Sequence, residues 1–420
     1  MTRRGLLGLA LVIGLAVAGP AFAQDEGDKP AAPQQNAPVP GPAPSGPVET
    51  AKIGFLSLKN DVRYHPQIAY TRIQIAPALH PVEGARVALK DMKILTDAAN
   101  VQLSLDEQEA ADANDAVAKL QAMAAAGERF AILDLPGDMV AQVGPALAST
   151  KITLINATAP QDALREMCMP NVLHAAASDR MLADAYTQFL RHRNWLKVLV
   201  LQGDQPRDKE MADAFQASAD RSGIQIAARK QFTLSTDPAN RENNDTLLIT
   251  GGLDYDVIYI ADSLGEYARG LPYATQLPRP VIGSTGLTAS EWHWSWSQDS
   301  ATQITLRFQR ASEGNRVMSG YDWDTWMAFK AVATAYAKAR STDPEKIDAY
   351  LKGKRLKLDG SKGILMDFRP WDRQLRMPIV LATSDSTVGA APFPEFLHEG
   401  NELDSLGVDQ PESKCQVAQQ

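Results

Sequence analysis

Residues 283–329 concentrate the side chains best suited to hold a flat ligand. Indole offers a large apolar face and one N–H donor, which suits a planar aromatic molecule in a cleft. In an extended segment, alternate residues point to one face, so the first three indoles would form an aromatic wall. The alternative is that these rings cover an apolar edge between two lobes. Five of the seven tryptophans lie here: Trp292, Trp294, Trp296, Trp323 and Trp326.

The last two of these tryptophans fall on an expected helix, 322–340. Trp323 and Trp326 are three residues apart, so core packing is the alternative role for at least one ring. Tyr321 and Asp322 stand at the start of this helix. They are candidates for ligand binding or for a hinge.

Cationic and polar residues follow the expected strands. Arginine can hold a carboxylate with two parallel N–H bonds, and each charge-assisted bond contributes about 1.5–3 kcal/mol. A lysine could also form a reversible adduct with a ligand carbonyl. The alternatives are solvated lysines and surface ion pairs, Asp61 with Arg63 and Asp204 with Arg207. The candidates are Lys59, Arg63, Tyr64, Asn156, Thr158, Arg165, Gln202, Asp204, Arg207, Lys209, Asp262, Ser284 and Thr285.

Near-continuous apolar runs predict the strands that position these residues. Runs without alternation indicate strands buried on both faces, as in parallel sheets. Amphipathic helical patterns separate them, for example 82–95, 113–127, 178–192 and 209–223. This repeated order predicts an α/β fold of two Rossmann-like lobes with a hinge and an interlobe cleft. The expected strands are 51–58, 130–135, 151–157, 197–203, 254–262 and 280–285.

The chain is expected to divide into five parts. Arg3 and Arg4, an apolar run and Ala21-Phe22-Ala23 are typical of a cleavable secretory signal peptide, 1–23, which predicts a periplasmic protein. A Pro/Ala-rich stretch, 24–50, predicts a disordered leader. Lobe 1 is expected over 51–173 and lobe 2 over 174–298. A segment shared by both lobes follows, 299–420, in which 358–368 and 373–383 are expected to pair as a hairpin around Trp371 and Asp372.

Composition excludes some functions. The net charge of −8 argues against nucleic acid as a partner. No Cys or His pair has metal-ligand spacing, and no nucleophile elbow or phosphate-binding glycine loop is present, so we expect no metal site and no enzyme. An oxidising compartment permits a disulfide between Cys168 and Cys415; two unpaired thiols are the alternative.

Several long motifs resemble a known family. The crossing NVLHAAASDRMLADAYTQFL and the helix opening Gly320-Tyr321-Asp322 resemble type I periplasmic binding proteins of the branched-chain amino acid class. NDVRYHP (60–66), LREMCMPNVLH (164–174), the stretch 271–294 and FRPWDRQLRMPIVLA (368–382) resemble a branch linked to pyrroloquinoline quinone (PQQ)-dependent alcohol oxidation, which includes a PQQ-binding protein.

This resemblance implies a periplasmic solute-binding protein that holds PQQ, a flat tricarboxylate, between its lobes. Its partner in transport would be an inner-membrane ABC permease. If it supplies cofactor, its partner would be a PQQ-dependent dehydrogenase that serves methylotrophy. PQQ would be a bound ligand and not a catalytic cofactor, and a monomer is expected. The alternatives are a receptor for an alcohol, carboxylate or amino acid, and a carrier or sensor without transport.

Overall fold

The computed structural model describes residues 48–68, 74–75, 79–235, 237–339, 341 and 343–415. The expected signal peptide and most of the expected leader lie outside these residues. The first strand, β1, begins at Glu49 and not at Ala51. No helix of the described residues is both long and apolar enough to cross a membrane.

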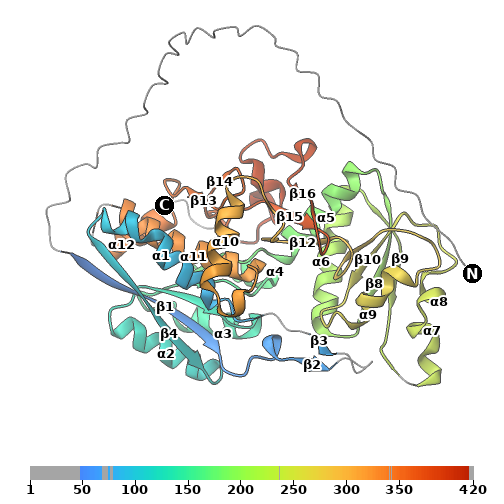
Figure 1. The fold of residues 1–420 in the computed structure, drawn as a ribbon, viewed down its shortest axis with the longest axis horizontal. Coiled ribbons are helices and arrows are strands. Elements are labelled where there is room, and N and C mark those ends of the chain that lie inside the picture. Colours follow the sequence, from blue (N-terminus) through green and yellow to red (C-terminus); the bar gives the residue numbers. More distant parts are fainter. Residues whose placement is uncertain are drawn as a thin grey trace, which may run out of the picture. The chain divides into compact units, whose positions relative to one another are not determined.

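The first sheet has five parallel strands in the order β4-β1-β5-β6-β7 (Figure 1). Its inner strands β5 and β6 are buried along their length because helices cover both faces of the sheet. Two apolar cores therefore form, one on each side of the sheet. The elements are β1 (Glu49–Leu58), α1 (Val82–Asp97), β4 (Val101–Ala110), α2 (Ala113–Ala125), β5 (Phe130–Asp134), α3 (Gly137–Ala146), β6 (Thr153–Asn156), α4 (Asp162–Glu166) and β7 (Val172–His174).

The second sheet has four parallel strands in the order β11-β10-β8-β9. Ser178 caps the start of helix α5, because its side chain accepts a hydrogen bond from the Met181 backbone N–H. The elements are α5 (Asp179–His192), β8 (Lys197–Gln202), α6 (Pro206–Ser222), β9 (Gln225–Gln231), α7 (Arg241–Asn244), α8 (Thr246–Thr250), β10 (Val257–Ala261), α9 (Glu266–Gly270) and β11 (Val281–Gly283).

The remaining elements pack on both halves. Helices α10 and α11 pack against α1, whereas the antiparallel sheet β12-β15-β16 packs against α5. Strands β2 and β3 form one short antiparallel pair, and strands β13 and β14 form another. The bounds are β2 (Gln67–Ile68), β3 (Gln74–Ile75), β12 (Thr288–Ser290), α10 (Ala301–Ala311), α11 (Gly320–Lys338), α12 (Pro344–Leu351), β13 (Leu358–Asp359), β14 (Leu365–Met366), β15 (Ile379–Ala382) and β16 (Thr387–Ala391).

The expected long hairpin around Trp371 is only partly present. Close to the turn, Arg369 donates its N–H to Gln374 and Arg376 donates to Asp367, so a short hairpin forms. Further out, the prediction is wrong. Strands β13 and β14 pair with each other, and β15 pairs with β12 and β16. Several partners compete for these short apolar segments, and sequence alone does not rank them.

Candidate functional site

One buried carboxylate organises the carboxyl edge of the first sheet. Asp134 ends β5 and is fully buried. It accepts a hydrogen bond from the Tyr64 hydroxyl at 2.6 Å, and the His80 Nδ1 lies 2.8 Å from its other oxygen. The Tyr64 and His80 rings contact each other at a centroid distance of 4.0 Å. Burial first, and then the charge of Asp134, raises the pKa of Tyr64, so its hydroxyl stays a donor.

Arg63 joins this cluster but has no spare N–H. Its Nε and Nη2 donate to Asp61, with Nη2 also reaching Asp134 at 3.2 Å. Its Nη1 donates to the carbonyl oxygen of Thr158 at 3.2 Å and to the Thr158 hydroxyl at 3.1 Å. The expected pairing with Asp61 is confirmed, although Asp61 is buried and not on the surface. A ligand carboxylate would have to displace one of these bonds.

Arg207 is the corresponding cation of the second half. It grips Asp179, at the start of α5, with both terminal nitrogens, one of them at 2.5 Å, and contacts Glu210 at 3.1 Å. The expected pairing with Asp204 is wrong, because Asp204 instead accepts from Gln205. The Arg207 Nε–H has no hydrogen-bond partner among the described residues, and the side chain is 27% exposed. Arg207 can therefore still donate to a ligand.

Charged groups of both clusters act on the pKa of Tyr321. Tyr321 lies in the first turn of α11 and is partly exposed. Burial raises its pKa to about 12; the charge of Arg63 opposes this rise, that of Glu291 adds to it, and Arg207 and Asp179 act in the same two directions. We call Arg63, Tyr64, His80, Asp134, Arg207 and Tyr321 the interlobe site.

The predicted tryptophan wall is wrong. Residues 291–296 form a turn and are not extended, since the backbone N–H of Trp296 donates to the backbone carbonyl of His293 at 3.0 Å. Trp292 and Trp296 are therefore buried, at 2% and 8% exposure, whereas Trp294 is 45% exposed. The alternative, in which the rings cover an apolar edge between two lobes, lies nearer to this geometry, because Trp292 and Trp296 belong to the apolar core.

The two helical tryptophans are core residues. Trp323 and Trp326 are buried, and their indole N–H groups donate to the Gly360 carbonyl and to Asp91. The Trp292 ring lies nearly parallel to that of Trp323, 6.3 Å away. These rings are not presented to the interlobe site.

Arg165 is an internal clamp. It is 5% exposed and donates to the side chain of Gln374 and to the carbonyl oxygens of Ala159, Gln161 and Ala176. Burial lowers its pKa to about 10. Its donors all point at the protein itself, so the structure does not bring it to the interlobe site.

The other predicted residues serve local structure or lie in solvent. Asn156 accepts from the Thr158 and Ala159 N–H groups, and Asp322 forms a capping box with Ser319 and an ion pair with Arg316. Three more predicted residues accept hydrogen bonds within the protein: Gln202 from the Arg229 side chain, Asp262 from the backbone N–H groups of Gly265 and Ala268, and Ser284 from the backbone N–H of Asp262. Lys209 forms an ion pair with Asp213. Lys59 is exposed, and Thr285 is half-buried.

The structure joins Cys168 and Cys415 in a disulfide, with the Cα atoms 5.3 Å apart. This confirms the predicted pairing. No group of three or more His, Cys, Asp or Glu residues in the described part of the chain is placed to hold a metal ion.

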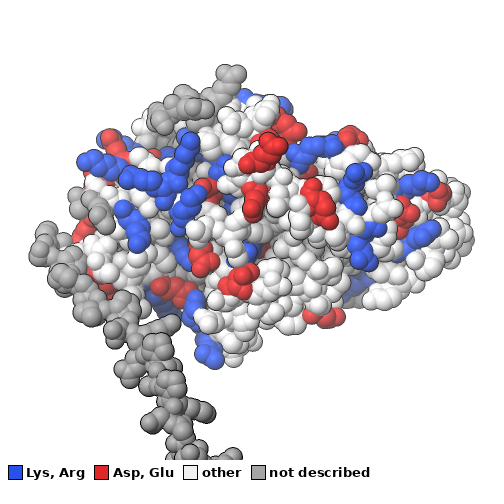
Figure 2. Space-filling view, turned by 90° about the horizontal axis from the view of Figure 1, so that it is seen from above, with Lys and Arg blue, Asp and Glu red and all other residues white. Residues whose placement is uncertain are grey.

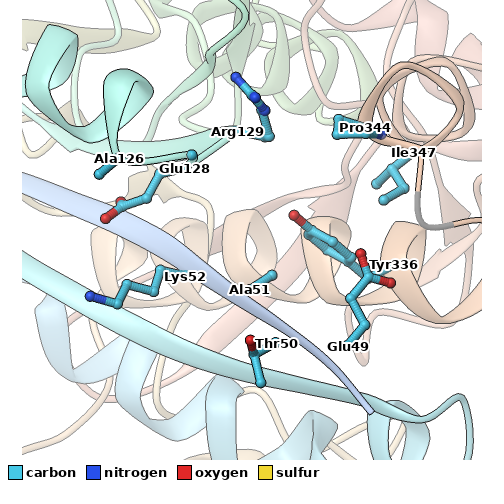
Figure 3. Close-up of a pocket in the computed structure, with 11 residues that line it drawn as sticks. Glu49, Thr50, Ala51, Lys52, Ala126, Glu128, Arg129, Tyr336, Pro344 and Ile347 are labelled. Atoms are coloured by element: carbon cyan, nitrogen blue, oxygen red, sulfur yellow. The ribbon is translucent and has the colours of Figure 1, made fainter. Parts of the chain in front are cut away.

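Two cavities lie away from the interlobe site. The first, of about 300 Å³, is lined by the amino-terminal end of β1, Glu128, Arg129 and Tyr336 (Figure 3). The second, of about 1840 Å³, is lined by the amino-terminal ends of β5 and β6 and by C-terminal residues. Both lie at the sheet edge opposite the one that ligands of open α/β folds use. On the face shown in Figure 2, cationic and anionic side chains are interspersed.

A second polar cluster is buried beside Tyr321, within the core. Asp324 is fully buried, and neither of its carboxyl oxygens has a hydrogen-bond partner among the described residues. The Lys362 ammonium donates to the Pro378 carbonyl at 2.8 Å and lies 3.7 Å from the Trp323 ring centroid. Burial raises the pKa of Asp324 well above its usual range, and burial lowers the pKa of Lys362 to about 7.

Replacing Asp324 with asparagine is expected to stabilise the protein at pH 8 by about 1–3 kcal/mol, because it removes an unpaired buried acid. The folded-state pKa is raised above the unfolded value of 3.8. Above pH 3.8 the unfolded state therefore binds fewer protons than the folded state, and Asp324 lowers the free energy of unfolding more as the pH rises toward its folded-state pKa. Thermal unfolding at pH 4 and pH 8 measures the effect, with the exposed Asp97→Asn as control. An equal gain at both pH values would contradict a charge effect.

With this geometry in place, comparison with known proteins is informative. A family model described as periplasmic binding protein matches residues 81–240. A branched-chain amino acid ABC transporter periplasmic ligand-binding protein from Burkholderia xenovorans superposes with a TM-score of 0.67 at 13% identity, over 87% of this chain and 99% of that one. The chain has the type I periplasmic binding protein fold. The predicted fold is thus confirmed.

Two further structures with this fold contain ligands. The branched-chain amino acid transporter substrate-binding protein from Streptococcus pneumoniae, in complex with isoleucine, has a TM-score of 0.59 at 16% identity, over 81% and 99% of the two chains. A solute-binding protein from R. palustris, in complex with benzoate, has a TM-score of 0.61 at 11% identity, over 89% and 100%. None of the curated proteins matches the sequence. The matching family is one of binding proteins, which supports the prediction that the chain is not an enzyme.

Proposed function

We propose that this protein binds a small solute between its two lobes and presents it to the permease of an ABC importer in the periplasm. The observation that carries the proposal is one guanidinium group at the carboxyl end of each sheet: Arg63 contacts Asp134 at the end of β5, and Arg207, just after β8, pairs with Asp179 at the start of α5. A ligand that contacts both lobes binds the closed form better than the open form, and so drives closure.

We favour a carboxylate- or amino-acid-type solute as the ligand. Arg207 has N–H capacity left for one carboxylate, whereas Arg63 has none without losing a bond to its own chain. Tyr321, which is partly exposed, supplies aromatic surface for a small apolar group. The ligands of the two similar complexes, isoleucine and benzoate, each carry one carboxylate, which supports the same class.

PQQ, taken up or supplied to a dehydrogenase, is the second candidate. The long motifs 271–294 and 368–382 favour it. Against it stand the buried indoles, which cannot stack on a tricyclic ring in this conformation, and the need to hold three carboxylates. A rearrangement that frees Arg63 from Asp61 would be required.

Calorimetric titration of the purified protein with leucine, benzoate and PQQ distinguishes these candidates. We expect one-to-one binding of leucine or benzoate and none of PQQ. Arg207→Met should weaken binding about tenfold or more, because one charge-assisted bond is worth about 1.5–3 kcal/mol. Lys93→Met, an exposed change on α1, is the matched control. Binding of PQQ alone would favour the second candidate, and binding that is indifferent to both Arg207→Met and Tyr321→Ala would contradict the proposed site.

A further inference from the structure

The chain passes between its two halves three times before its last segment. It leaves β7 of the first sheet at 175–178 to enter α5. It returns at 291–300, between β12 and α10, which packs on α1. It leaves again at 377–378, between the short hairpin beside His174 and β15, which packs on α5. Any bending between the lobes must occur in these crossing segments.

Residues 398–415, which we call the strap, follow these crossings and are held on the second half. The Gly407 N–H donates to Asp184 of α5 at 2.7 Å. Arg221 of α6 donates to the Gly407 carbonyl at 3.0 Å and pairs with Glu412 at 3.2 Å. Just before the strap, Phe393 stacks on His192 at a centroid distance of 5.0 Å.

The same strap is also held on the first half. Cys415 forms the disulfide with Cys168, which lies between α4 and β7. Beside it, Lys414 pairs with Glu166 at 2.8 Å. Further back, Trp371 of the short hairpin donates its indole N–H to the Val408 carbonyl at 3.0 Å. One short segment is thus fastened to both halves, and at one end covalently.

We propose that the strap is a fourth connection between the lobes, and that the Cys168–Cys415 disulfide makes it restrict their opening. The disulfide cannot lengthen when the lobes move apart. Opening beyond the slack of the strap must then break the contacts of Arg221 and Gly407 on α5 and α6. The range of motion is set by the strap whatever the ligand is. In an oxidising compartment the restraint is in place.

Hydrogen exchange measured by mass spectrometry tests this on the protein without ligand. The double variant Cys168→Ser with Cys415→Ser releases the strap from the first half, and Arg221→Met loosens it on the second. Each should speed exchange in the crossing segments 175–178, 291–300 and 377–378. At least tenfold is expected for Arg221→Met, because the loss of one charge-assisted contact, worth roughly 1.4 kcal/mol, already gives tenfold, and Arg221 contacts the strap at Ser405, Gly407 and Glu412. Exchange in β5 and β8 should not change.

The control separates the strap from general destabilisation. Lys197→Met removes an exposed ion pair of the second half that does not touch the strap, and it should leave the crossing segments unchanged. Unchanged exchange in the crossing segments of both strap variants would overturn the proposal. A change in the cysteine variant alone would also overturn it, because the strap would then not be held at its Arg221 end. Uniformly faster exchange, including β5 and β8, would reduce the strap to a general stabiliser.

Discussion

Alanine at Trp323 is expected to lower the free energy of unfolding by roughly 3–5 kcal/mol, the usual cost of truncating a buried tryptophan. Its ring is fully buried and lies nearly parallel to Trp292. The Lys362 ammonium lies 3.7 Å above its centroid, and its indole N–H satisfies the Gly360 carbonyl. Truncation removes all of these contacts at once and leaves a cavity. Urea denaturation of the purified variant measures the loss.

Trp294→Ala is the matched control for this prediction. The ring is 45% exposed and makes one hydrogen bond, of 3.3 Å, to the Ser384 carbonyl. Its truncation should therefore cost less than about 1 kcal/mol. Equal losses for the two variants would show that Trp323 is not the interior residue described above. Weaker ligand binding in a stable Trp294→Ala protein would revive a binding role for this exposed indole.

Arg165→Met is expected to destabilise the protein by about 3 kcal/mol, because the buried Gln374 side-chain oxygen loses the Arg165 donor and three buried carbonyl oxygens each keep only one of two donors. These carbonyls belong to Ala159 and Gln161, which follow β6, and to Ala176, which follows β7. Methionine keeps much of the apolar stem, so the loss reports the guanidinium. Thermal and urea unfolding give the size of the effect.

Arg207→Met should differ from Arg165→Met in its effect on ligand binding. Arg207 is partly exposed, so its loss should reduce ligand affinity; it also leaves the buried Asp179 carboxylate without its paired cation, so stability should fall as well. A folded Arg165→Met protein should bind as tightly as the wild type. If Arg165→Met loses binding and keeps its stability, then the internal clamp has been misassigned and Arg165 faces the ligand.

Much of the architecture could be predicted from the sequence, because strands buried on both faces leave an unbroken apolar run. β5, β6, β8 and β10 all fall within predicted strands. The edge strands β4 and β9 were missed for the same reason. β4 pairs along only one side, and its apolar residues alternate with polar ones. An apolar-run criterion does not detect such a pattern.

The site was harder to predict than the fold. Arg63, Tyr64, Arg207 and Tyr321 were candidates; Arg63 and Tyr64 both contact Asp134, and the part of all four residues in ligand binding stays a prediction. Asp134 and His80 were not candidates, although Asp134 ends a predicted strand, where a buried polar residue is a usable signal. The tryptophan prediction failed because alternate residues share one face only where the backbone is extended. A turn at 293–296 breaks that alternation, so the three indoles do not line one face.

The central claim is that a small ligand sits between the two lobes against Tyr321 and Arg207. The most direct measurement is a crystal structure with the solute that binds most tightly among leucine, benzoate and PQQ. We predict density between the carboxyl edges of the two sheets, with a ligand oxygen within hydrogen-bond distance of Arg207. Density confined to the cavity of Figure 3, with the space beside Tyr321 filled by the protein's own side chains, would contradict the account.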